Sequence, residues 1–315
     1  MSTDYEERHR ERLLQHARNA ASAFQDHDLV SGIVVGGSPS QGGADRESDF
    51  DMLVIVKQLP AVETRGAWLT SVTGKHVDPS SLTGTEERKW DEFGGPKDEP
   101  EQWMGTGGGL FYFTEDEISR DLSRIAELLV AFTGRNELER PSHIEEYLAD
   151  LAHGVVLYDA AGFVTECRRQ LADYPETARI HLINYHWRRA EIALNEDLRR
   201  AVWRADLVHA YDRRVEGTRH LIRMLFAVNR RYFRKAKSLH RLLPSFGACP
   251  PRTWERLIEG LRETDPMRGA AILLALAAEM IALIEPPDAI EGRDHWLWVC
   301  NRWAEEYGIA ERDSR

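Results

Sequence analysis

Cysteine and long apolar runs are both scarce in this chain of 315 residues. The three cysteines, Cys167, Cys249 and Cys300, lie far apart and form no Cys-x-x-Cys pair. This spacing excludes a disulfide framework and a cysteine-based zinc site, and it is typical of a reducing compartment. The most apolar run, 270–284, is interrupted by Glu279 and falls short of the roughly 20 residues that cross a bilayer. We expect a core helix there, in a cytoplasmic protein with no membrane partner.

The chain also has no excess of positive charge. Lys and Arg number 41 against 52 Asp and Glu, which gives a net charge of −11. An acidic chain of this kind does not coat duplex DNA, so we expect no DNA partner. The segment 188–241 differs, because it holds 15 basic and 6 acidic residues, a local balance of +9. Such a segment can contact phosphate groups, although solvated faces of bundle helices would show the same composition.

The two halves of the chain differ in hydrophobic pattern. Up to residue 162, short β-branched runs alternate with helical stretches and glycine-rich turns, and beyond it nearly every segment has helical periodicity. The pattern predicts strands at 29–35, 50–56, 76–78, 110–113 and 155–158, and helices at 5–24, 115–132, 165–172, 177–204, 206–233, 252–262, 266–285 and 295–307. We therefore expect an α/β (α+β) domain with a small mixed sheet at 1–162 and an all-helical bundle at 163–315.

The segment 34–56 holds the residues that point to chemistry. An apolar strand leads into Gly37-Ser38, and ten residues later Asp49-Phe50-Asp51 begins a second apolar strand. Glycine lets a phosphate approach the backbone, where amide groups and a serine hydroxyl can bind its oxygens. Asp49 and Asp51, two apart in a strand, share one face while Phe50 points to the other. Two such carboxylates repel unless a cation such as Mg²⁺ lies between them, so the segment predicts phosphoryl or nucleotidyl transfer.

This segment resembles the signature of the DNA polymerase β-like nucleotidyltransferase superfamily, namely an apolar residue, Gly, Gly or Ser, a short spacer and Asp-x-Asp. Its fuller form, with a glycine-bearing loop and Ser-Asp-x-Asp, is similar to the small-molecule and antibiotic branch. The stretch 156–162 is similar to the strand and turn that close the catalytic domain in several such enzymes. The stretch 204–237 is similar to an uncharacterised helical domain that follows bacterial nucleotidyltransferase domains. The resemblance implies a catalytic palm at 1–162 and a helical domain at 163–315 that closes over the nucleotide, with the site in the cleft between them.

The resemblance also implies residue roles. Gly37 and Ser38 would hold the β- and γ-phosphates, and Asp49 and Asp51 would bind two Mg²⁺ ions. A third carboxylate comes from a following strand in the family, and Asp78 is the best placed to complete the second metal site or act as general base. The Pro79-Ser80 pair departs from the usual apolar flank of that strand.

In the basic segment, Arg230 and Lys237 are the residues that we expect to contact the triphosphate.

The implied reaction is Mg²⁺-dependent transfer of a nucleoside monophosphate, AMP from ATP, to a hydroxyl of a small-molecule acceptor such as an antibiotic. An acidic surface suits cationic aminoglycosides.

Three other functions stay open. One is a toxin–antitoxin-type transferase that acts on tRNA or protein, and another is an inactive nucleotide-binding regulatory module. The third is ribonuclease activity of the HEPN type, for which the helical half offers three Arg-x4–6-His pairs: Arg204 with His209, Arg214 with His220, and Arg234 with His240.

Overall fold

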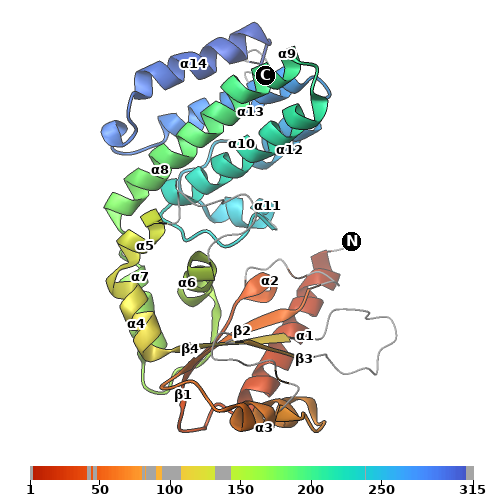
Figure 1. Cartoon of the computed structure of the whole chain (residues 1–315), viewed down its shortest axis with the longest axis vertical. Coiled ribbons are helices and arrows are strands. Elements are labelled where there is room, and N and C mark those ends of the chain that lie inside the picture. The colour runs from red at the N-terminus through yellow and green to blue at the C-terminus, as the bar shows by residue number, and fades with distance from the viewer. Residues whose placement is uncertain are drawn as a thin grey trace. The chain divides into compact units, whose positions relative to one another are not determined.

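The computed structural model describes residues 3–40, 44, 48–79, 82, 90–93, 108–131, 143–237 and 239–309 (Figure 1). The chain forms two compact units. The first consists of Met1–Ile125 and His143–Asp173, and the second of Ala126–Ser142 and Tyr174–Arg315.

A five-stranded mixed sheet, in the order β3-β4-β2-β1-β5, forms the centre of the first unit. The strands are β1 (Val30–Val35), β2 (Phe50–Val56), β3 (Trp90–Phe93), β4 (Gly108–Thr114) and β5 (Val155–Tyr158). Strand β2 runs antiparallel to β1 and parallel to β4, and the β1–β5 and β3–β4 pairs are antiparallel. The predicted α/β (α+β) class with a small mixed sheet is confirmed.

Two helices, α1 (Thr3–Ser22) and α3 (Val62–Thr73), cover one face of this sheet. Their buried apolar residues pack against alternate residues of β1, β2 and β4 in one core. Phe50 belongs to this core and is 1% exposed, as its position between two aspartates predicts. Side chains alternate along a strand, so Asp51 lies on the opposite face.

The opposite face is covered by α4 (Glu115–Ser123), α6 (His143–His153) and α7 (Phe163–Leu171). Helix α7 lies so close to β1 that a Cβ at Gly32 would meet the Val164 side chain. The short helix α2 (Gly37–Ser40) directly follows β1, whereas α5 (Ile125–Ala131), which follows α4, belongs to the second unit except for its first residue.

The second unit is helical in its described part. Its helices are α8 (Glu176–Glu191), α9 (Leu198–Trp203), α10 (Leu207–Val228), α11 (Leu239–Leu242), α12 (Thr253–Arg262), α13 (Pro266–Ala282) and α14 (Arg293–Glu306). Helix α8 continues through a π-helical segment, Ile192–Asp197, into α9, and α10 packs back along α8 (Figure 1). Helix α13 is buried along most of its length, as expected for a core helix. No helix in the described ranges has the length and apolarity of a membrane span.

The structure differs from the sequence-based expectations in three places. Residues 76–78 form no strand, since they follow the end of α3 and its left-handed Gly74 cap. The helix expected at 115–132 is divided at Arg124, where α4 ends. The first unit extends to Asp173 rather than to residue 162, because α7 packs on α4, α6 and β1. Residues 94–107, between β3 and β4, lie outside the described part of the chain.

Candidate functional site

The glycine-serine turn directly follows β1 at one end of the sheet. The Gly36 amide donates a hydrogen bond to the Asp51 carbonyl oxygen at 2.8 Å, so the backbone ties the turn to the start of β2. Gly37 has φ +71°, in the left-handed region that glycine enters without steric cost. Ser38 follows on α2 and is partly exposed. The turn that the sequence pattern predicts is therefore present, with its serine accessible.

The two predicted metal ligands lie at the start of β2, next to this turn. Asp49 directly precedes the strand and is exposed, and Asp51 is its second residue and is partly buried. Phe50 between them is buried in the core under α1 and α3. Alternation along the strand thus directs the Asp51 carboxylate to the face that α6 and α7 cover, and Asp49 directly precedes the strand.

Gly109 on the neighbouring strand leaves space beside Asp51. It pairs with Asp51 in the parallel β2–β4 register. A Cβ at this position would lie 3.3 Å from Asp51 Oδ1 and 2.7 Å from the Phe111 ring, so a larger residue would crowd the carboxylate. On β3, the residue in register with Gly109 is the acidic Glu92.

Asp150 is a site residue that the sequence reasoning missed. It lies on α6, is 5% exposed, and accepts a hydrogen bond from the Gly37 amide at 3.2 Å through Oδ1. A Cβ on Gly36 would overlap its carboxylate. Asp150 therefore holds the turn in place, and its carboxylate takes up the hydrogen-bonding capacity of the Gly37 amide. The sequence does contain a sign of it, because Asp150 stands between Ala149 and Leu151 at buried positions of α6, where an aspartate is unusual.

Asp78 lies apart from any strand. It is exposed, in the segment after α3, where the Val77 amide donates to the Thr70 hydroxyl at 3.0 Å. Among the described residues, no three Asp, Glu, His or Cys side chains converge as a metal-binding group. The structure thus places Asp49 and Asp51 at the start of β2, and Asp78 in the segment after α3, apart from any described strand. Its role as third carboxylate stays a prediction.

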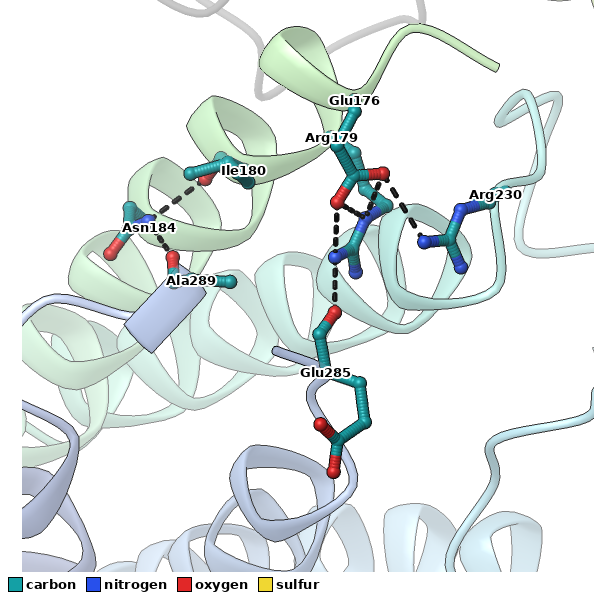
Figure 2. A network of polar contacts seen from close by, with 7 residues as sticks. All are labelled: Glu176, Arg179, Ile180, Asn184, Arg230, Glu285 and Ala289. Carbon is teal, nitrogen blue, oxygen red and sulfur yellow. Dashed lines mark hydrogen bonds and ion pairs between the residues drawn. The ribbon is translucent and has the colours of Figure 1, made fainter. Parts of the chain in front are cut away.

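Arg230 and Lys237 belong to the second unit. Figure 2 shows the Glu176 carboxylate between the guanidinium groups of Arg230 and Arg179, with Arg230 Nη2 at 3.2 Å from Glu176 Oε2. Arg179 is buried and also donates to the Glu285 carbonyl. Hydrogen bonds from Arg179, and more weakly the charge of Arg230, lower the pKa of Glu176. Arg230 therefore already pairs with an anion in the structure, Lys237 is exposed, and contact of either with a nucleotide stays a prediction.

One of the three Arg–His pairs has a clear structural role. Arg214 is fully buried and donates to the Glu263 and Leu261 carbonyl oxygens, at 2.6 and 3.2 Å, at the end of α12. His220 is buried as well, with its Nδ1 at 2.9 Å from Nδ1 of His186. Burial lowers the pKa of His220 to about 3, with a smaller effect from nearby arginines. This Arg–His pair is engaged in helix packing and helix capping, which gives no support to a ribonuclease site.

Comparisons with known proteins give limited similarity. Residues 142–237, under a third of the chain, match a family described as a domain of unknown function (DUF4037). No curated protein matches the chain. Among solved structures, the chain is similar to a nucleotidyltransferase-like protein from Exiguobacterium sibiricum at 15% identity, with 96% of this chain and 80% of that chain covered. The TM-score of that pair is 0.38, and at this value the likeness carries no argument about fold or activity.

Proposed function

We propose that the first unit is a nucleotidyltransferase domain that transfers a nucleoside monophosphate, AMP from ATP, to a hydroxyl of a small-molecule acceptor such as an antibiotic. The hydrogen bond from the Gly36 amide to the Asp51 carbonyl carries the proposal. It holds the glycine-serine turn and the Asp49–Asp51 pair at the same end of the sheet. A phosphate-binding turn beside two carboxylates is the minimum that this chemistry needs.

The donor set suits a hard divalent cation. Asp49 and Asp51 offer carboxylate oxygens at the start of β2, and Gly109 leaves room beside Asp51. Mg²⁺ prefers oxygen ligands and keeps several waters, so two protein carboxylates with phosphate oxygens and water form a suitable shell. Bound there, the ion would neutralise triphosphate charge and lower the pKa of the acceptor hydroxyl.

In the proposed reaction, the acceptor oxygen attacks the α-phosphorus of the nucleotide. The new P–O bond forms as the bond to the bridging α–β oxygen breaks, and pyrophosphate leaves with that electron pair. The hydroxyl proton passes to a base, for which Asp78 is the predicted residue. The Gly37 amide already donates its hydrogen bond to Asp150. The Ser38 hydroxyl is therefore the remaining predicted phosphate contact on this turn.

One observation favours a second candidate, an RNA acceptor. A hollow of about 950 Å³ along α1 and β5 is lined by Arg8, Arg10, Arg12 and Arg18, and Glu11 is the one acidic residue among its described lining residues. Arg10 Nε donates to the Pro39 carbonyl oxygen at 2.7 Å, so the hollow adjoins the glycine-serine turn. Four arginines in such a hollow suit a phosphate-rich chain better than a cationic antibiotic.

The test is pyrophosphate release from each NTP with Mg²⁺, in the presence of pooled aminoglycosides, pooled lincosamides or total tRNA. We expect release with ATP and one acceptor pool, and a loss of at least 100-fold in Asp49→Asn or Asp51→Asn, because each removes a metal ligand. The matched control is Glu63→Gln, an exposed carboxylate on α3. Release that survives both aspartate substitutions would contradict the proposed site.

The same assay separates the acceptor classes and the third carboxylate. Activity on tRNA that falls steeply between low and moderate salt indicates contacts with phosphates, whereas a small-molecule acceptor shows weak salt dependence. The variants Asp78→Asn and Glu92→Gln test which acidic residue is the third carboxylate. Asp78 is the predicted one, and Glu92 is the residue in register with Gly109.

A further inference from the structure

An apolar surface lies uncovered where α9 ends and α10 begins. Trp203 is 88% exposed, Leu207 58%, Val208 83%, Tyr211 43% and Val215 38%. We refer to these five residues as the α10 stripe. Contiguous apolar surface of this kind is rare on a soluble monomer and marks an interaction site.

The stripe follows from the periodicity of α10. At 100° per residue, Leu207, Tyr211 and Val215 recur every fourth position, and Val208 lies beside them, so the four share an arc of about 100°. The inner face of the same turns is buried through Ala210, Arg214 and Gly217. The first turns of helix α10 are therefore buried on one face, and a second, apolar face has no cover from the described residues.

Trp203 joins this face through the tight connection between the two helices. The Ala205 amide donates to the Val202 carbonyl oxygen and the Asp206 amide to that of Ala201, both at 2.9 Å. These bonds hold the last turn of α9 against the first turn of α10.

The size and composition of the stripe match the centre of a protein interface. Its five side chains expose on the order of 600 Å² together, so two copies facing each other would bury on the order of 1,200 Å², the lower end of stable interfaces. Tryptophan and tyrosine are the residue types that dominate binding energy at such centres.

We propose that the α10 stripe is the contact surface between two copies of this chain, related by a two-fold axis that passes near Tyr211. In an antiparallel α10 pair about this axis, Leu207 of one copy faces Val215 of the other, and the two Tyr211 side chains lie next to the axis.

The charges around the stripe support a second copy as the occupant. Both signs are exposed around it, with Asp206 and Asp212 on one side of the count and Arg204, Arg219 and the α9 residues Arg199 and Arg200 on the other. In the antiparallel pair, Arg219 of one copy lies opposite the segment that holds Trp203 and Asp206 in the other, where a cation–π contact and an ion pair are both within reach. Because both signs are present, opposite charges can face each other between two copies of the chain, whereas a rim of one sign would favour a partner of opposite charge.

The test is sedimentation velocity of the full chain between 1 and 100 µM. We expect a species of twice 36.1 kDa for the wild type. Val208→Glu places two like charges in the contact and should weaken dimerisation at least 10-fold. Trp203→Ser should do the same, whereas Trp298→Ser, at a 56% exposed tryptophan on α14, is the matched control and should leave the dimer unchanged. A wild-type monomer at 100 µM, or a dimer insensitive to Val208→Glu, would overturn the proposal.

A cross-link tests the symmetry independently of affinity. Tyr211→Cys places one thiol per copy next to the proposed axis, and mild oxidation should give a reducible dimer in high yield. Two of the three native cysteines are buried, and the wild type serves as the control for the third, Cys249. Rapid cross-linking at 211 supports the antiparallel pair, and failure to cross-link in a dimeric sample overturns that geometry.

Discussion

At the residue scale, glycines and one buried carboxylate determine the shape of the candidate site. Gly36 makes room for the Asp150 carboxylate, Gly37 adopts a positive φ, and Gly109 leaves space beside Asp51. Asp150 accepts a hydrogen bond from the Gly37 amide, and this bond holds the turn in place. A short sequence motif such as Gly-Ser thus depends on a residue more than one hundred positions away.

Substitution at Gly36 tests this close packing. Gly36→Ala adds a Cβ that meets the buried Asp150 carboxylate, so we expect the free energy of unfolding to fall by about 1–3 kcal/mol, the usual cost of overpacking. The matched control is Gly247→Ala, since nothing lies within 4 Å of a Cβ there. Urea denaturation of both variants measures the difference. Equal stability of the two variants would show that α6 does not press on the turn.

The sequence allowed some site residues to be predicted and concealed others, for physical reasons. Phe50 between two aspartates could be assigned to the core, because alternation in a strand is a local rule. Asp150 could not, because the amide it binds is distant in the sequence. The strand expected around Asp78 was wrong, since Gly74 ends α3 in a left-handed cap and the chain leaves the sheet there.

At the scale of elements, α8 and α10 are joined through a buried histidine pair. His186 and His220 share one hydrogen bond between their Nδ1 atoms, so one ring donates and the other accepts, and the accepting Nδ1 carries no proton. Burial lowers the pKa of both rings, and for His186 the nearby His220 adds to the effect. Arg189, Arg219 and Arg223 disfavour a further proton, whereas Glu216, 3.9 Å from His220 Nε2, favours one.

Stability should therefore depend on pH through these two rings. Above pH 6.5 both are neutral in the folded and unfolded chain, and the full stability is present. Below it the unfolded chain takes up protons at both histidines, whereas in the folded chain His220 stays neutral until about pH 3 and burial also lowers the pKa of His186, so stability falls with decreasing pH. The loss reaches about 1.4 kcal/mol per pH unit for each histidine.

The measurement is thermal unfolding of the wild type and of His186→Leu/His220→Leu between pH 7 and 4. We expect a shallower decline in the double variant, because its side chains do not titrate. His209→Gln, at an exposed histidine near the start of α10, is the control and should decline as the wild type does. Parallel curves for wild type and double variant would contradict the account.

At the scale of the whole molecule, the change in hydrophobic pattern predicted a mixed-sheet part followed by helices, and the structure has both. Strands 30–35 and 50–56 and the helix at 266–282 are where the periodicity placed them, since their apolar residues are buried. The boundary between the two units was predicted at residue 162, before α7, because α7 has the amphipathic pattern of any bundle helix. Its packing on β1 depends on Gly32, and a single glycine in a strand does not indicate which helix it contacts. Composition also gave no sign that part of the apolar surface, the α10 stripe, is exposed.

The affinity of the chain for ATP with and without Mg²⁺ tests the proposed nucleotide site without any knowledge of the acceptor. Isothermal titration should show binding that weakens at least 10-fold when EDTA replaces Mg²⁺. Asp49→Asn/Asp51→Asn should lower the wild-type affinity in Mg²⁺ to the EDTA level, and Glu63→Gln should not. Affinity that is equal with Mg²⁺ and EDTA, or unchanged in the double aspartate variant, would contradict a nucleotidyltransferase site at this end of the sheet.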